Sequence, residues 1–140
     1  MSENVTKQLH LIVGLLATLA FVLSGQAMHF HQPKLPALPD DVHLMYLSRH
    51  IYLAAAAMVN VCLSLYLKDQ SSSWRRVLQK MGSLMTLFSP IFLLLAFLYE
   101  PSLGMAGRSW RSQLGMIPMI IGVGLHFVAN LAAKTNSAAN

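Results

Sequence analysis

Charged residues are scarce in this chain: Asp, Glu, Lys and Arg together make up only 11% of its 140 residues. Soluble domains usually carry about 25%, so the composition excludes an ordinary water-soluble domain and indicates a chain that folds in lipid. Hydrophobic residues make up 55% of the sequence. The length leaves room for about four helices of roughly 20 residues, the length that crosses the hydrocarbon core of a bilayer.

Cysteine and acidic residues are also few. The single cysteine, Cys62, lies inside an apolar run, which excludes a disulfide framework. Ten basic residues oppose only five acidic ones, for a net charge of +5. The basic residues lie at the ends of apolar runs, where they act as topology signals, so we expect no nucleic-acid partner. The sequence also lacks a glycine-rich phosphate loop, an HExxH helix, and a Ser or Cys placed beside a base.

Four apolar segments predict the fold. They cover residues 9–28, 44–67, 77–99 and 113–133. We predict an all-α integral membrane protein, a four-helix transmembrane bundle in which residues 1–140 form a single domain. The connection 29–43 contains three prolines, which favour extended backbone. Asp40 and Asp41 follow them and suit the start of the second helix, as caps and as anions at its positive end.

The distribution of basic residues predicts the orientation. With four spans, the two termini and the connection 68–80 share one side of the membrane. That side carries six basic residues: Lys7, Lys68, Arg75, Arg76, Lys80 and Lys134. The opposite side carries Lys34, Arg108 and Arg111, and Arg49 lies inside the second span. The positive-inside rule then places both termini in the cytoplasm, and residues 26–52 face outward, toward the periplasm if the source is a Gram-negative bacterium.

Small and polar side chains predict where the helices pack, since lipid provides little hydrophobic drive between them. Gly115, Gly122 and Ala129 are spaced seven residues apart and form one stripe along the fourth span. Asn60 lies near the middle of the second span, where an unpaired amide is costly, so we expect it to face another helix. Pro90 bends the third span, and we expect Thr86 to satisfy the carbonyl that the proline leaves free.

The first connection contains a candidate metal site. His29 and His31 point the same way if the chain is extended there, and His43 with the carboxylates of Asp40 and Asp41 completes a nitrogen and oxygen set suited to zinc or copper. No known ligand spacing is matched. The alternative is a solvated loop near the lipid headgroups, in which the two aspartates serve only the helix end.

Haem ligation is a second candidate. His10 and His126 lie in the same half of the first and fourth spans and are the residue types that hold haem iron. His10 is placed at the membrane edge, however, about seven residues shallower than His126, which predicts a depth mismatch of several ångströms. His50, in the other half, faces a similar mismatch with His29. The alternative is that each histidine hydrogen-bonds a neighbouring helix.

A polar cluster of Arg49, His50 and Glu100 is the third candidate. Ionisable side chains inside a span are functional candidates by default, and Arg49 and His50 lie more than a turn inside the second span. Glu100 closes the third span and is the natural counter-charge, since the two spans run side by side. The alternative is that Arg49 reaches the interface and serves only as an anchor.

Three strings in the sequence resemble those of a known family. They are GQAMHF at residues 25–30, SRHIY at 48–52 and FLYEP at 97–101. All three resemble an uncharacterised family of small bacterial inner-membrane proteins with four spans, and the resemblance covers the first three spans. It implies the four-span architecture and brings no activity, cofactor or catalytic residue with it.

These observations predict a small accessory or interaction subunit without catalysis of its own. Its partners are the lipid bilayer and either other membrane-protein subunits or further copies of the chain. The alternative is a protein that binds haem or a transition metal through the histidines. A third reading is an enzyme that binds a small molecule or a lipid headgroup through Arg49, His50 and Glu100.

The charge asymmetry leads to a prediction about topology. Reporter fusions or labelling of introduced cysteines should place Ser72 and residue 140 in the cytoplasm, and His31 and Gly107 outside, because basic residues are retained on the cytoplasmic side. Labelling of position 72 by a reagent that cannot cross the membrane would reverse this orientation.

Overall fold

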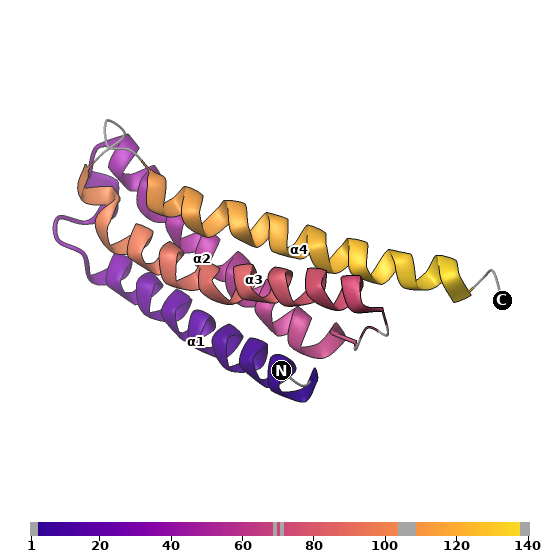
Figure 1. The fold of residues 1–140 in the computed structure, drawn as a ribbon. Helices are drawn as coiled ribbons and strands as arrows, with labels where there is room; N and C mark the ends of the chain where they lie inside the picture. Colours follow the sequence, from indigo (N-terminus) through magenta and orange to yellow (C-terminus); the bar gives the residue numbers. More distant parts are fainter. Residues whose placement is uncertain (1–2, 69, 71, 104–108, 138–140) are drawn as a thin grey trace.

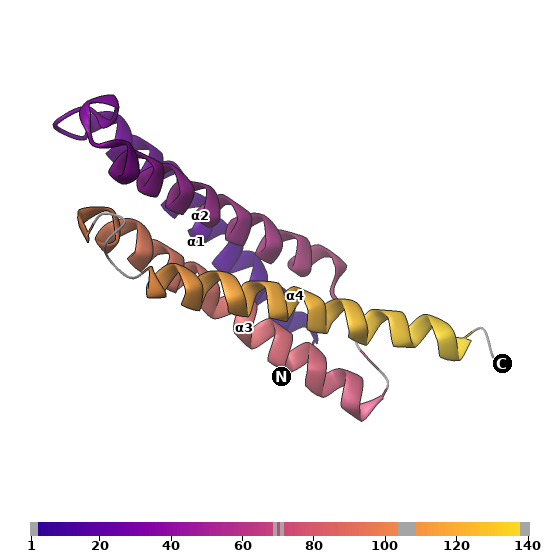
Figure 2. The same cartoon turned by 90° about the horizontal axis from the view of Figure 1, so that it is seen from above.

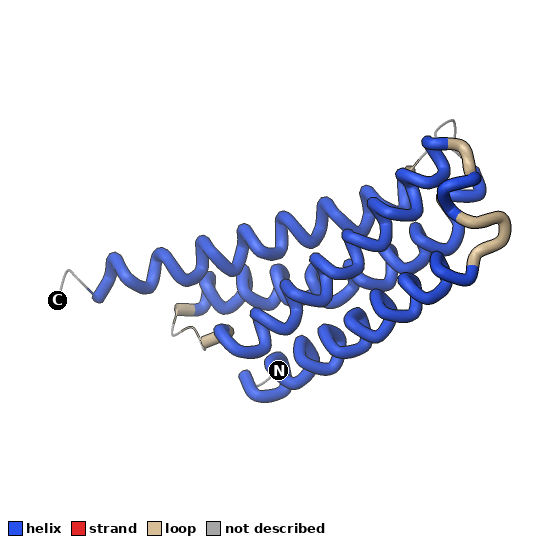
Figure 3. The backbone as a smooth tube through the Cα atoms, turned by 180° about the vertical axis from the view of Figure 1, so that it is seen from behind, coloured by secondary structure: helices blue, strands red, loops and turns tan. Residues whose placement is uncertain are grey.

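The computed structural model describes residues 3–137 apart from 69, 71 and 104–108, and it describes the side chains of these residues from 4 to 131. It contains four long helices: α1 (Glu3–Phe30), α2 (Asp40–Tyr66), α3 (Ser73–Tyr99) and α4 (Trp110–Ser137). Two short 3-10 turns, η1 (Leu35–Ala37) and η2 (Pro101–Leu103), lie in the connections. The helices run alternately up and down, as Figures 1 and 3 show. The predicted all-α bundle of four helices is confirmed.

All four helices are long and apolar enough to cross a membrane. At 27 or 28 residues each, they are about 40 Å long, which exceeds the roughly 30 Å of a bilayer core. Large apolar side chains cover their outward faces, and Leu16, Met58, Ile91 and Ile120 are each more than half exposed. In water such a surface would be costly. It therefore indicates contact with lipid.

The helices extend beyond most of the predicted span ends. α1 begins at Glu3 instead of residue 9 and continues to Phe30 instead of 28. α2 and α3 each begin four residues earlier than predicted, and α4 runs from Trp110 to Ser137 instead of 113–133. The apolar pattern marks only the part of a helix that lies in hydrocarbon, and the backbone remains helical among the polar residues on either side. Gly107, Arg108 and residue 140, on which the topology prediction partly rests, lie outside the described residues.

The bundle consists of two helical hairpins. α1 packs along α2 and α3 packs along α4, and the two hairpins meet mainly through α2 and α3 (Figure 2). Both chain termini lie at one end, which we call the proximal end; the opposite end is the distal end (Figure 1). Between the hairpins lies an apolar core of Leu53, Ala56, Leu93, Phe97 and Met119.

Within the second hairpin, α3 and α4 approach each other through glycine. A Cβ atom at Gly122 would lie 2.7 Å from the carbonyl oxygen of Gly82, and one at Gly82 would lie 2.7 Å from the carbonyl oxygen of Gly122. Gly115 packs against the side chain of Leu93 on α3, and Ala129 is fully buried. The predicted contact through this stripe is confirmed, and it lies inside the bundle.

Replacing Gly122 by leucine should therefore lower the free energy of unfolding by at least about 1–3 kcal/mol, because the new side chain has no space next to the α3 backbone. The measurement is thermal unfolding in detergent. Gly124→Leu is the matched control, since no atom of the described residues lies within 4 Å of where its Cβ would be. Equal unfolding temperatures for the two variants would contradict this packing.

Candidate functional site

A hydrogen-bond chain that reaches into the proximal half of the bundle begins at Pro90 on α3. Proline has no backbone N–H, so the carbonyl of Thr86 lacks its usual helical donor. The side-chain amide of Asn60 on α2 replaces that donor: its Nδ2 donates to Thr86 O at 3.1 Å and to Ala56 O at 2.9 Å. The expectation that Thr86 itself satisfies this carbonyl is wrong. The Thr86 hydroxyl donates to the carbonyls of the preceding turn, Gly82 and Ser83.

The same amide determines which nitrogen of His10 carries hydrogen. Both Asn60 amide hydrogens point to carbonyls, so Asn60 Oδ1 is left as an acceptor, 2.8 Å from His10 Nδ1. The neutral His10 ring must then carry its hydrogen on Nδ1 and a lone pair on Nε2. His10 is 0% exposed, and Nε2 has no hydrogen-bond partner among the described residues.

His126 on α4 provides a second imidazole. Its ring centroid lies 6.2 Å from that of His10, with 73° between the two ring planes. His126 is 4% exposed, and its Nε2 lies 3.3 Å from the hydroxyl oxygen of Ser83 on α3. We call His10, Asn60, Ser83 and His126 the histidine cluster. Each of the four helices contributes one of its members.

The predicted depth mismatch between His10 and His126 is wrong. The prediction placed His10 at the membrane edge because the first span was taken to begin at residue 9, but α1 begins at Glu3. His10 therefore lies about two turns inside its helix. The structure brings together two histidines that sequence reasoning had separated.

The hydrogen bond described for the His50 side chain is with Ser24 on α1, outside both the histidine cluster and the pair of Arg49 and Glu100. Ser24 donates its hydroxyl hydrogen to Phe21 O at 2.8 Å, so its oxygen accepts from His50 Nδ1, also at 2.8 Å. The His50 ring stacks on Phe21, with the ring centroids 4.2 Å apart. His50 thus joins α1 to α2 within one hairpin. Its predicted places in a haem site or beside Arg49 and Glu100 are not what the structure shows.

Arg49 and Glu100 form a buried ion pair near the distal end, as predicted. Arg49 Nε lies 3.0 Å from Glu100 Oε2, and Glu100 is 1% exposed. The remaining guanidinium nitrogens donate to the hydroxyls of Ser48 and Ser109. The Glu100 carboxylate accepts the backbone N–H of Ser112 at 3.0 Å and also its hydroxyl. It therefore lies at the positive end of α4 and joins that helix to α2 and α3.

The predicted metal site in the first connection is wrong. α1 remains helical through His29 and Phe30, so His29 and His31 do not share a direction as they would in an extended chain. His31 is fully engaged, because its Nδ1 donates to Pro33 O at 2.8 Å and its Nε2 accepts from the Tyr46 hydroxyl at 3.3 Å. In the part of the chain that the structure describes, no three His, Cys, Asp or Glu side chains are placed to hold a metal, so His43, Asp40 and Asp41 add no such site.

The two aspartates also differ from their predicted role as caps. Pro39 is the residue that caps α2, and no side chain makes a capping hydrogen bond there. Asp40 and Asp41 lie in the first turn of α2, where their charges favour the positive end of the helix dipole.

Several partners in these networks were missed by sequence reasoning. Ser109 and Ser112 hold the distal ion pair, and Asn60 holds His10. The prediction that Asn60 faces another helix is confirmed by its bond to Thr86 O on α3. Its contact with His10 was the part that the sequence did not reveal. Serines carry no signal for such partners, since most of them in membrane helices bond to their own backbone.

No family model, curated protein or solved structure matches this chain. The resemblance to small four-span bacterial proteins stays a prediction, and functional inference depends on the geometry of the two polar groups.

The distal ion pair leads to a double-mutant cycle. Glu100→Gln should lower the free energy of unfolding by about 3 kcal/mol, because it leaves a poorly solvated guanidinium behind. Adding Arg49→Gln should restore part of that loss, as measured by unfolding in detergent. Arg111→Gln is the control, since Arg111 lies at the same end, stacked over Trp110 and Tyr99. Additive losses in the cycle would show that Arg49 and Glu100 do not interact.

Proposed function

We propose that this protein binds a transition-metal ion inside the membrane through His10 and His126. The observation that carries the proposal is the orientation of His10. Its Nδ1–H donates to Asn60 Oδ1, and its Nε2 lone pair is buried without a partner among the described residues. Histidines that ligate metals almost always donate their other N–H to an oxygen in this manner, which sets the tautomer and the ring direction.

The energetic cost of the arrangement supports a bound ligand. A buried acceptor without a hydrogen bond costs about 1–3 kcal/mol, and a span in hydrocarbon offers no bulk water to replace the missing donor. A metal ion at Nε2 removes this cost. The second imidazole, that of His126, lies 6.2 Å away between centroids in the other hairpin. Since its Nε2 is bonded to Ser83, its Nδ1 is the nitrogen proposed as the further ligand.

The packing around His126 favours a bare ion over haem, the other cofactor that the sequence suggested. A porphyrin lies between its two axial ligands and extends beyond them on all sides. The His126 ring lies directly against α3, since a Cβ atom at Gly82 would be 3.0 Å from His126 Cδ2, and Ser83 Oγ is 3.3 Å from Nε2. The α3 backbone occupies space that a macrocycle needs.

The proposed setting is the inner membrane of a bacterium, with both termini in the cytoplasm. The support is the excess of basic residues on the terminal side of the chain, six against three. In this orientation the histidine cluster lies closer to the cytoplasmic face than to the outer face, because Asn60 lies in the last third of α2 and His10 in the first third of α1.

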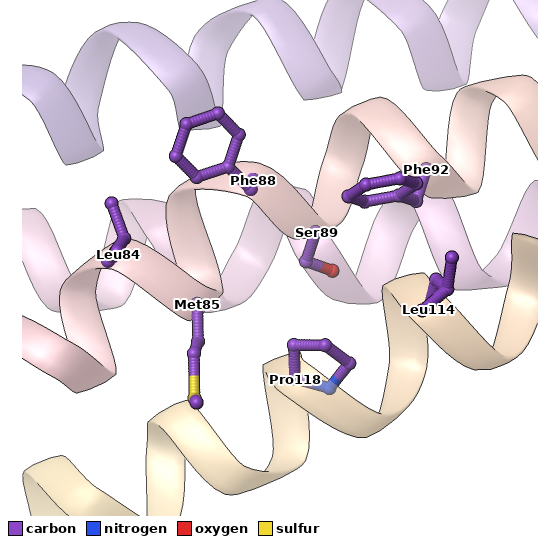
Figure 4. A pocket seen from close by; sticks show the side chains of 7 residues that line it. All are labelled: Leu84, Met85, Phe88, Ser89, Phe92, Leu114 and Pro118. Carbon is purple, nitrogen blue, oxygen red and sulfur yellow. The ribbon is translucent and has the colours of Figure 1, made fainter.

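An interaction subunit is the second candidate, and a groove between α3 and α4 favours it. The groove has a volume of about 210 Å³ and is lined by Leu84, Met85, Phe88, Ser89, Phe92, Leu114 and Pro118 (Figure 4). The Ser89 hydroxyl is buried there without a hydrogen-bond partner among the described residues. A helix from another subunit or a second copy would cover the apolar walls of this groove. A single-chain mass in detergent would count against a second copy.

Metal content tests the first proposal. Purified protein exposed without oxygen to Mn(II), Fe(II), Co(II), Ni(II), Cu(I) and Zn(II), then desalted, should retain about one ion per chain by elemental analysis. His10→Gln and His126→Gln should each lose it, because each removes one of two ligands. His50→Gln is the matched control, a span histidine outside the cluster, and it should retain the ion.

Three outcomes would overturn the proposal. One is that no ion is retained, and another is that His10→Gln and the unaltered protein retain the same amount. The third is a Soret band in the absorbance spectrum of the purified protein, which would replace the bare ion with haem.

A further inference from the structure

We infer that the ion held by His10 and His126 is monovalent copper, Cu(I), in a site with two imidazole ligands. This inference rests on the proposed metal-binding function and names the ion. Three properties of the histidine cluster support it: its charge, the number of its ligands and the separation of the two rings.

The charge of the cluster favours a monovalent ion. An imidazole that ligates a metal is neutral, and Asn60 and Ser83 carry no charge. The acidic side chains that the structure describes, Asp40, Asp41 and Glu100, lie at the distal end. Asp40 opens α2 and Asn60 lies close to its other end, about 30 Å away along the helix. Among the described acidic side chains, none therefore lies near the cluster to neutralise the ion's charge, and since solvation energy rises with the square of the charge, a divalent ion is far costlier to bury.

The number of ligands also favours Cu(I). No group of three or more His, Cys, Asp or Glu side chains is placed to hold a metal among the residues described here. Zinc in proteins takes four ligands, with at least three from side chains. Cu(I) has a filled d shell and is satisfied by two ligands on opposite sides; thiolates and thioethers are its preferred ligands, and imidazole is also a copper ligand. Such a two-coordinate site requires no charged ligand and no bound water.

The distance between the ring centroids is compatible with such a site. Two imidazoles on opposite sides of one ion, with metal–nitrogen bonds of about 2 Å, have ring centroids about 6 Å apart. The observed separation is 6.2 Å. A linear site allows free rotation about its axis, so it places no condition on the angle between the ring planes, which is 73° here.

Asn60 acts as a positioning residue for this ligand set. It holds the hydrogen on His10 Nδ1, so that Nε2 offers a lone pair and binding releases no proton from His10. Asn60 is itself held by the Thr86 carbonyl that Pro90 leaves free. A proline in α3 thereby sets the tautomer of a ligand on α1.

The test is an anaerobic titration of the full-length protein in detergent with Cu(I), in competition with bicinchoninate, a chromophoric Cu(I) chelator. The expected result is one Cu(I) per chain. His10→Gln and His126→Gln should each weaken binding by at least the roughly 100-fold that loss of a second-shell partner alone can cause. His50→Gln should bind as the unaltered protein does.

Two measurements on the unaltered protein keep the test independent of how the variants fold. X-ray absorption of the Cu(I) form should report two nitrogen neighbours. Ag(I), which is also monovalent with a filled d shell, should displace Cu(I), whereas Zn(II) in the same excess should not.

The outcomes separate the two proposals. Retention of Zn(II), Co(II) or Ni(II) through His10 and His126 in preference to Cu(I) would overturn the choice of ion and leave the metal site standing. A copper site with three or four ligands would do the same. Failure to retain any ion, or retention that His10→Gln and His126→Gln leave unchanged, would overturn the metal site itself.

Discussion

The proximal half of this bundle depends on one carbonyl. Pro90 deprives Thr86 O of its helical donor, and inside a membrane a backbone acceptor must find a partner within the protein. Asn60 supplies it from α2, and that single hydrogen bond joins the two hairpins at the level of the bundle core. Because the Asn60 amide donates both of its hydrogens to carbonyls, its oxygen remains as the acceptor for His10 Nδ1. The position of Asn60 thus determines that Nδ1 of His10 carries a hydrogen.

Two kinds of contact hold the structure together. Within the second hairpin, glycine permits close backbone approach, as at Gly82 and Gly122. Between the hairpins an apolar core is accompanied by polar contacts at three levels: the distal ion pair, the histidine cluster, and the bond from Gln70 to Asn130 at the proximal end. Lipid competes well for apolar surface and poorly for hydrogen bonds. The polar contacts therefore specify how one hairpin sits on the other.

The two buried polar groups differ in how completely they are satisfied. At the distal end the guanidinium of Arg49 and the carboxylate of Glu100 both have several partners, from α2, from α4 and from the connection before it. A buried ion pair that stabilises the structure requires such partners, because a buried charge without them destabilises the folded state. In the histidine cluster one nitrogen of His10 has no such partner. That difference directs the functional proposal to the histidines instead of the charged pair.

The amino-acid sequence by itself determined the number of helices, since apolar runs in lipid must satisfy their backbone internally. It also determined the pairing of Arg49 with Glu100, because consecutive antiparallel spans place the scarce opposite charges at the same level. Which histidines meet was decided only by the tertiary structure: His10 joins His126, whereas His29 and His31 do not share a site. Such pairings depend on where each helix begins, how it is rotated and which neighbour it faces. Those quantities follow from the packing of all four helices together and leave no periodic signal in any one of them.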